Sequence, residues 1–295
     1  MMRPLLDLDR INEELERKTP QEIIRWAHST FGNRLGLLSS MQKTASVLTF
    51  MIFQEGLKNT EIIFVDTGYH FQETLDLRDR MIEKYGVNIK TYYPDTTPEQ
   101  QFQQYGRELY LRDGDYQLCC KLRKEQPYLK AVNNFDAMLS GLMRSEGGAR
   151  KSIRIVTEDP RTDTYKVHPL ANWTVQDVKR FIEEYDILVH PLHSKGYPSI
   201  GCSTCTTPVA PNEDERAGRW RHIREANPNG PQKLYCGINF SDVNPSREEK
   251  SSEKTHHAPR SESENRTEEN QKDNSCDFRN NASNAQNVRE LVSSK

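Results

Sequence analysis

Residues 35–68 read LGLLSSMQKTASVLTFMIFQEGLKNTEIIFVDTG, and this stretch decides the fold. Two short, mostly apolar runs, 34–38 and 61–65, have the length and composition of buried strands. Residues 45–53 between them are long and apolar enough for a buried helix. A strand, a helix and a second strand of this kind form a right-handed crossover between parallel strands. The sequence therefore predicts an α/β protein with an open parallel sheet and flanking helices.

The alternation of strand and helix patterns continues on both sides of this unit. Pro20 stands where a first helical residue is expected, and its helix runs through Trp26. The remaining predicted segments are strands at 88–93 and 136–142 and helices at 73–85 and 121–132. Because no internal repeat or second boundary interrupts this pattern, we expect one large domain.

Polar residues follow two of the predicted strands, at Ser39–Thr44 and at Asp66-Thr67-Gly68. Ligands of open parallel sheets bind beyond the carboxyl ends of the strands, where helix N-termini attract anions. The Ser39–Thr44 turn is neither a Walker loop nor a dinucleotide fingerprint, and alone it also fits ordinary helix capping. The second polar strand end favours a binding site at this edge.

Four of the six cysteines form two tight pairs, Cys119-Cys120 and Cys202-Ser203-Thr204-Cys205. Four thiolates from short spacings are the usual ligands of an iron–sulfur cluster. Paired zinc ligands normally stand two to four residues apart, which adjacent cysteines do not satisfy. The spacing favours a cluster, with a structural zinc ion and unrelated core thiols as the alternatives.

Composition divides the 295-residue chain unevenly. The net charge is −2 and hydrophobic residues make up 34%, with the deficit concentrated in residues 241–295, which we predict to be a disordered polar tail. No apolar run has the length of a membrane span, and the first residues lack the apolar core of a secretory signal. We therefore expect a cytoplasmic protein with no membrane or nucleic-acid partner. Reducing conditions there argue against structural disulfides.

With these motifs placed, residues 35–239 resemble the assimilatory adenylyl-sulfate reductases and the related phosphoadenylyl-sulfate reductases. The resemblance rests on the strand-end serines and on Asp66–Phe71, Cys119–Lys124, Gly141–Arg144, His168–Trp173, Gly196–Cys202, Cys205, Glu215–Trp220 and Cys236-Gly237. It implies a fold like that of the adenine-nucleotide α-hydrolases, related to the PP-loop ATP pyrophosphatases. It also implies a 4Fe-4S cluster on Cys119, Cys120, Cys202 and Cys205.

The implied reaction, part of sulfate assimilation and cysteine biosynthesis, reduces adenosine 5′-phosphosulfate to sulfite and AMP. Cys236 would attack the substrate sulfur as a thiolate, and thioredoxin or a glutaredoxin-like dithiol would release sulfite from the resulting S-sulfocysteine. The resemblance also implies a homo-oligomer. The residues expected to bind substrate are Ser39, Ser40, Gln42, Lys124, Gly141, Arg144, Arg150, Arg216 and Arg219.

These roles divide the chain into three predicted parts. Residues 1–225 form the nucleotide-binding reductase domain with the cluster, 226–240 form a mobile segment that carries the catalytic cysteine, and 241–295 form the tail. The nucleophile segment departs from the family pattern, because Tyr235 and Asn239 stand where the family has glutamate and histidine. Thr207 likewise stands where the family often has arginine.

Three alternatives remain open from the sequence. The substrate could be the 3′-phosphorylated nucleotide, or both nucleotides, since Lys43 would meet an additional phosphate if it faced the ribose. An ATP pyrophosphatase that thiolates tRNA shares the implied fold, but its glycine-rich loop is not present at 39–42. A zinc-stapled binding module is the alternative without enzymatic activity. Cys276 and His256-His257 lie in the polar tail and carry no predicted role.

Overall fold

The computed structural model describes residues 3–230. Within them six strands form one sheet in the order β3-β2-β1-β4-β6-β5. The strands are β1 (Leu35–Ser39), β2 (Glu61–Val65), β3 (Ile89–Tyr92), β4 (Ala137–Leu139), β5 (Val156–Asp159) and β6 (Thr164–Val167). The α-helices are α1 (Leu8–Leu15), α2 (Pro20–Phe31), α3 (Lys43–Gln54), α4 (Gln72–Tyr85), α5 (Pro98–Tyr105), α6 (Asp115–Cys120), α7 (Gln126–Val132), α8 (Val175–Glu184) and α9 (Arg221–Ala226).

The β1–α3–β2 unit predicted from residues 35–68 is confirmed. β1 pairs in parallel with β2, where Leu37 aligns with Ile62, and on its other side with β4, where Gly36 aligns with Met138. α2 starts at Pro20 as expected and is longer than predicted. Its N-terminus is closed by a capping box, in which Thr19 and Glu22 each satisfy a backbone N–H of the other.

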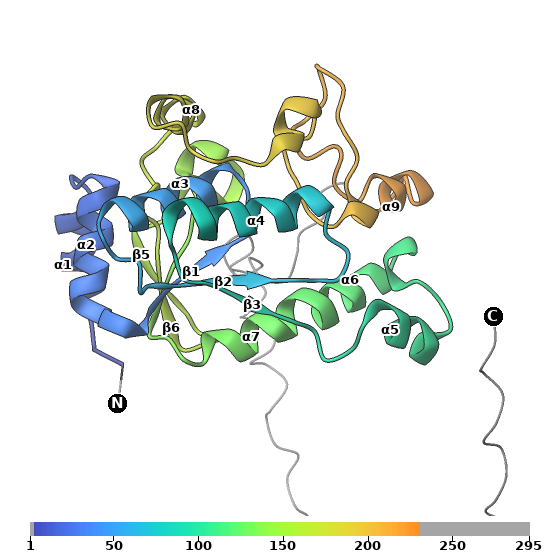
Figure 1. Cartoon of the computed structure of the whole chain (residues 1–295), viewed down its shortest axis with the longest axis horizontal. Helices are drawn as coiled ribbons and strands as arrows, with labels where there is room; N and C mark the ends of the chain where they lie inside the picture. The colour runs from blue at the N-terminus through green and yellow to red at the C-terminus, as the bar shows by residue number, and fades with distance from the viewer. Residues whose placement is uncertain (1–2, 231–295) are drawn as a thin grey trace, which may run out of the picture. The chain divides into compact units, whose positions relative to one another are not determined.

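Side chains of β2 alternate between two apolar cores, one on each face of the sheet. Ile62 and Phe64 belong to the larger core under α2, α3, α4 and α8, whereas Ile63 and Val65 pack against Tyr128 and Val132 of α7. Figure 1 shows α3 and α4 along one face of the sheet and α7 along the other. Because both faces are covered, the strand reads as a continuous apolar run.

The open parallel sheet of the prediction ends in an antiparallel strand that the sequence did not reveal. β5 pairs antiparallel with β6, and β6 pairs parallel with β4. Lys166 of β6 is buried, and its ammonium lies 3.0 Å from the carboxylate of Asp159. The same carboxylate also accepts a hydrogen bond from Arg161. Charged residues that neutralise each other inside a hairpin do not produce an apolar strand pattern, which is why the hairpin was missed.

The helix predicted at 121–132 starts earlier and is not uniform. Helical backbone begins at Asp115, passes through a π-helical turn at Lys121–Glu125 and continues as α7, with Pro127 in its first turn. Proline has no N–H for the ladder, so the regular helix restarts there. π-Turns inside helices often mark functional sites, and this one directly follows Cys119 and Cys120.

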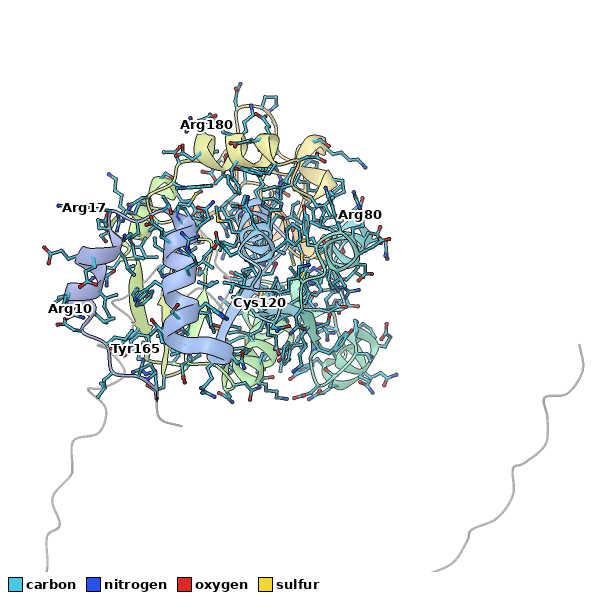
Figure 2. All side chains as sticks on the ribbon, turned by 60° about the vertical axis from the view of Figure 1, so that its left-hand side comes forward. Arg10, Arg17, Arg80, Cys120, Tyr165 and Arg180 are labelled. Carbon is cyan, nitrogen blue, oxygen red and sulfur yellow. The ribbon has the colours of Figure 1, made fainter. Side chains whose placement is uncertain are left out.

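Side chains fill the space between the helices and the sheet, and Arg10, Arg17, Arg80 and Arg180 project from the outside of the molecule (Figure 2). Among residues 3–230, no helix combines the length and the apolar character that crossing a bilayer requires.

Candidate functional site

Both cysteine pairs line one cavity next to the segment that follows β2. Cys119, Cys202 and Cys205 are buried and Cys120 is partly exposed. The other residues around the cavity are Tyr69, Tyr110, Tyr116, Arg123, Lys124, Thr204 and Trp220. The structure thus brings together the four side chains that the sequence proposed as ligands.

The second cysteine pair is held by the polar segment that follows β2. The hydroxyl of Thr67 lies 3.3 Å from Sγ of Cys202, and the backbone N–H of Ser203 donates to the carbonyl of Tyr69 at 2.8 Å. The N–H of Trp220 donates to the carbonyl of Cys205, also at 2.8 Å. The Asp66-Thr67-Gly68 motif therefore contributes to the site by fixing a cysteine loop.

Burial and mutual repulsion disfavour thiolates in this cavity when it holds no cation. Burial raises the pKa of the Cys119 thiol to about 11, and the nearby sulfurs of Cys202 and Cys205 add to the rise. The pKa of Cys205 is also raised, chiefly by burial and then by Cys202. Bound metal reverses this preference, because metal coordination deprotonates thiols.

The donor set fits an iron–sulfur cluster by its chemistry. Four thiols from two segments surround one cavity, which matches the Cys₄ ligation of such clusters. In the part of the chain that is described, no group of three or more His, Cys, Asp or Glu side chains is arranged to hold a single metal ion. A cluster does not require that geometry, because its thiolates bind separate iron atoms.

Two buried guanidinium groups flank the cysteines without a carboxylate among their hydrogen-bond partners. Arg123, 2% exposed, donates to the carbonyls of Thr67 and Thr96 and to the side chain of Gln101. Arg219, 6% exposed, donates to the carbonyl of Ile200 at 3.0 Å and to Oγ of Ser199 at 3.4 Å. Buried cations are costly unless an anion is near, so this environment suits negatively charged groups.

The guanidinium of Arg219 lies directly over the backbone of Gly201. A Cβ at Gly201 would lie 2.2 Å from Nη2 of Arg219 and 2.5 Å from its Cζ. The guanidinium also lies over the ring of Trp220, with its Cζ 4.7 Å from the ring centroid. Only glycine at position 201 leaves room for this placement.

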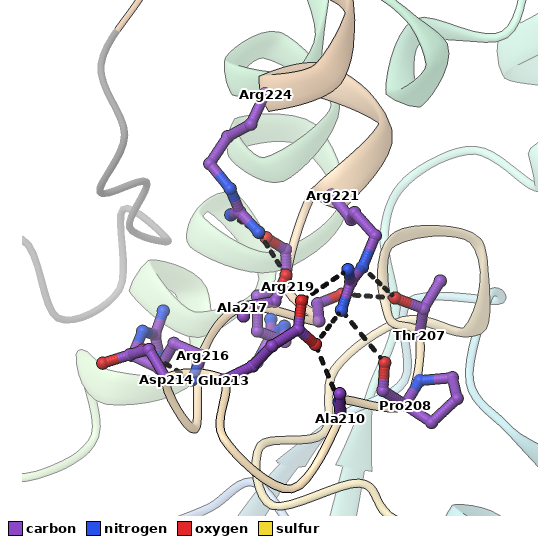
Figure 3. A network of polar contacts seen from close by, with 11 residues as sticks. Thr207, Pro208, Ala210, Glu213, Asp214, Arg216, Ala217, Arg219, Arg221 and Arg224 are labelled. Atoms are coloured by element: carbon purple, nitrogen blue, oxygen red, sulfur yellow. Dashed lines mark hydrogen bonds and ion pairs between the residues drawn. The ribbon is translucent and has the colours of Figure 1, made fainter. Parts of the chain in front are cut away.

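A compact polar network fixes the loop that carries Arg216 and Arg219 (Figure 3). Glu213 accepts hydrogen bonds from Arg221 at 2.8 and 2.9 Å and from the N–H of Ala210 at 2.8 Å. Arg224 donates to the carbonyls of Ala217 and Arg219. These hydrogen bonds hold the loop against α9 and so fix the backbone positions of Arg216 and Arg219.

The predicted nucleotide-binding residues gather at the neighbouring ends of β1 and β4. Oγ of Ser39 accepts the N–H of Met41 at 3.3 Å, in a turn where Met41 has a φ of 55°. Ser40 is exposed in the same turn, and Gln42 accepts the N–H of Ile200 at 3.1 Å, which joins this turn to the cysteine loop.

Gly141 lies where the end of β4 meets the start of α3. A Cβ on it would lie 2.5 Å from Oγ1 of Thr44 and 2.8 Å from its Cβ. This close approach explains glycine at the position independently of any ligand.

The basic residues that were predicted to bind substrate do not all lie at the cysteine cavity. Lys124 lines the cysteine cavity, and Arg219 lies over the ring of Trp220, which lines it too. By contrast, the guanidinium of Arg144 pairs with both carboxylate oxygens of Glu16, and Arg150 pairs with Glu146 at 2.7 Å. Arg144 also lines a separate cleft beside α1. The backbone N–H of Arg216 donates to Asp214, and its side chain is drawn in Figure 3.

Comparison with known proteins identifies the family. Residues 34–208 match the model described as the phosphoadenosine phosphosulfate reductase domain. The chain belongs to this family. It is 38% identical to the adenosine 5′-phosphosulfate reductase of Halalkalibacterium halodurans over 234 residues, covering 79% of this chain and 96% of that one. It is 37% identical to the enzyme of the same name from Streptomyces coelicolor, covering 78% and 92%.

A solved member of the phosphoadenosine phosphosulfate reductase family has the same fold. The phosphoadenylyl-sulfate reductase of Candida auris, determined as a phosphate complex, is 28% identical and superposes with a TM-score of 0.62 over 69% of this chain and 98% of its own. The predicted family and fold class are therefore confirmed, with a mostly parallel sheet.

The sequence analysis gave no role to two buried residues beside the cysteine cavity of this chain. Gln101 is buried at the cavity side of α5, and Arg123 occupies the π-turn that follows the first cysteine pair. Arg123 belongs to the Cys119–Lys124 motif, but no spacing marks it as buried. No sequence signal marks Gln101, since it lies among other glutamines on an amphipathic helix. The predicted nucleophile Cys236, its neighbours Tyr235 and Asn239, and the predicted tail lie outside the described residues.

Proposed function

We propose that this chain reduces adenosine 5′-phosphosulfate to sulfite and AMP in a thiol-dependent reaction of sulfate assimilation. The observation that carries the proposal is that both cysteine pairs line one cavity with the buried guanidinium of Arg123, while that of Arg219 lies over the cavity-lining Trp220. The names of the most similar relatives favour the same substrate. The 3′-phosphorylated nucleotide is the alternative, because the similar protein of Candida auris is named a phosphoadenylyl-sulfate reductase.

The reaction needs a nucleophile, a bound phosphosulfate and a reductant. The thiolate of Cys236 forms a bond to the substrate sulfur while the bond from that sulfur to the phosphate oxygen breaks, so AMP leaves with the electron pair. A dithiol such as thioredoxin then attacks the cysteine sulfur, releases sulfite and is oxidised to a disulfide. Residues 226–240 carry the nucleophile in this scheme, and residues 241–295 form an appendage.

The predicted basic residues would serve binding and charge neutralisation. Lys124 and Arg219, beside the cysteine cavity, are best placed to neutralise the phosphosulfate and the departing phosphate. Ser39, Ser40, Gln42 and Gly141 would hold the nucleotide at the ends of β1 and β4. Arg144, Arg150 and Arg216 complete the proposed set, and binding through Arg144 would require exchange of its contact with Glu16.

Cys119, Cys120, Cys202 and Cys205 would hold a 4Fe-4S cluster. When bound, this group supplies a fixed centre that joins the two cysteine segments and sets the charge felt by Lys124. We infer a homo-oligomer, as the resemblance implies, and we place the enzyme in the cytoplasm, as the sequence analysis predicts.

The decisive experiment is intact-protein mass spectrometry after anaerobic incubation with adenosine 5′-phosphosulfate and no reductant. The native chain should gain about 80 Da, the mass of one SO₃ on a thiol, and Cys236→Ala should gain nothing. Cys276→Ala is the matched control and should gain the same adduct as the native chain. An adduct formed only with the 3′-phosphorylated nucleotide would transfer the proposal to that substrate, and no adduct with either would contradict it.

A further inference from the structure

We infer that Gln101 and Arg123 are positioning residues for the cysteine centre, connecting one member of each cysteine pair. The inference rests on the cluster in the proposed function and adds the residues that orient its ligands. Neither residue belongs to the predicted ligand or substrate set, and both side chains are almost completely buried.

Arg123 occupies the centre of the connection. Its Nε donates to the carbonyl of Thr67, and its Nη1 donates to the carbonyl of Thr96 and to Oε1 of Gln101, each at 3.2 Å. The guanidinium also lies over the ring of Tyr69, 5.0 Å from its centroid. A planar group with several fixed donors can reach all three acceptors at once, which a lysine cannot do.

Each branch of this arrangement ends at a different cysteine pair. Gln101 accepts from Arg123 through Oε1 and directs Nε2 at Sγ of Cys119, 4.0 Å away. Thr67 accepts from Arg123 through its carbonyl, while its hydroxyl lies 3.3 Å from Sγ of Cys202. One guanidinium therefore orders a polar contact to a sulfur of each pair.

The arrangement also meets an electrostatic need. Arg123 is a buried cation whose hydrogen-bond partners are neutral oxygens, and it lines the cavity that the four cysteines surround. The carboxylate of Glu99 interacts with this charge from the surface. Cluster-bound thiolates would add anions on the cavity side, next to the guanidinium. Groups that orient ligands in this way typically change metal affinity about 10–100-fold when they are altered.

The test substitutes Gln101→Glu and compares it with Gln103→Glu, the same change at an exposed position of α5. The new carboxylate keeps a partner for Arg123 but removes the N–H donor to Cys119 and places an anion beside its sulfur. After anaerobic reconstitution, iron release to a chelator should be roughly 10–100-fold faster in Q101E than in Q103E. The visible circular-dichroism bands of the bound cluster should also change.

Two further measurements separate positioning from folding. The iron-free Q101E chain should unfold at nearly the same urea concentration as iron-free Q103E, because the new carboxylate pairs with Arg123. Arg123→Lys should also speed iron release, since it keeps the charge but loses the simultaneous contacts to Thr67 and Gln101.

Native-like iron release in both Q101E and R123K would overturn the inference while leaving the cluster in place. Faster release matched by an equal loss of iron-free stability would assign the effect to folding and overturn it as well. A native chain that binds no iron would contradict the cluster itself, and the inference with it.

Discussion

Substitution of Gly201 should impair substrate turnover although the residue carries no functional group. The guanidinium of Arg219 occupies the space where a Cβ would stand, 2.2 Å from Nη2, so Gly201→Ala forces it to move. Because the clashing atoms belong to the end of a flexible side chain, the folding cost should be small, about 1 kcal/mol. The main consequence is the displacement of a cation proposed to contact the phosphosulfate.

The magnitude follows from the lost interaction. A hydrogen bond to a charged group contributes about 1.5–3 kcal/mol, which corresponds to roughly a 10- to 150-fold lower kcat/KM. Arg219→Met should show the full loss and Gly201→Ala a loss in the same range. Arg112→Met, which removes an exposed arginine, is the control and should stay within about threefold of the native value.

The assay is sulfite formation from adenosine 5′-phosphosulfate with a dithiol reductant, with iron content measured in each sample. A Gly201→Ala enzyme with native kcat/KM, alongside a strongly impaired Arg219→Met enzyme, would refute the idea that the space over Gly201 fixes the arginine. Loss of iron in Gly201→Ala would instead show that the cysteine loop had been disturbed.

Two further predictions concern stability, both measured by urea unfolding. Gly141→Ala should lower the free energy of unfolding by about 1–3 kcal/mol, because its Cβ would lie 2.5 Å from Oγ1 of Thr44. Asp159→Asn should cost about 3–5 kcal/mol, because it removes the carboxylate charge that lies 3.0 Å from the buried ammonium of Lys166. Burial alone would raise the pKa of Asp159, but the hydrogen bond from Arg161 and the charge of Lys166 outweigh it and lower that pKa below 3.8. Its stabilisation is therefore complete above pH 3.8 and lost as the pH falls through the lowered pKa; the variant should lack this acid-dependent component.

Sequence reasoning succeeded where a single local pattern determines the structure. The mostly apolar runs at 34–38 and 61–65 predict buried strands, and the tight cysteine pairs indicate a shared site before any contact is known. It failed at β5 and β6, whose burial depends on an ion pair between the two strands. Neither strand has the pattern of a buried element when it is read alone.

Long-range partners account for what the sequence did not reveal at the candidate site. Arg144 was grouped with the substrate-binding residues, but its contact with Glu16 joins segments that lie far apart in the chain. Gln101 becomes significant only because α5 packs beside the cysteine helix and buries its amide. Such contacts have no periodicity and no fixed spacing, so one sequence cannot show them.

The distance along the chain between the two cysteine pairs imposes an order on biosynthesis. Cys119 and Cys120 are translated before β4, β5, β6 and α8, and Cys202 and Cys205 come after them. At a synthesis rate of about 5–20 residues per second, the second pair is synthesised roughly ten seconds after the first. During that interval the nascent chain holds two adjacent thiols without the loop that completes their cavity. A cluster that needs all four cysteines can therefore bind only after synthesis has passed Cys205.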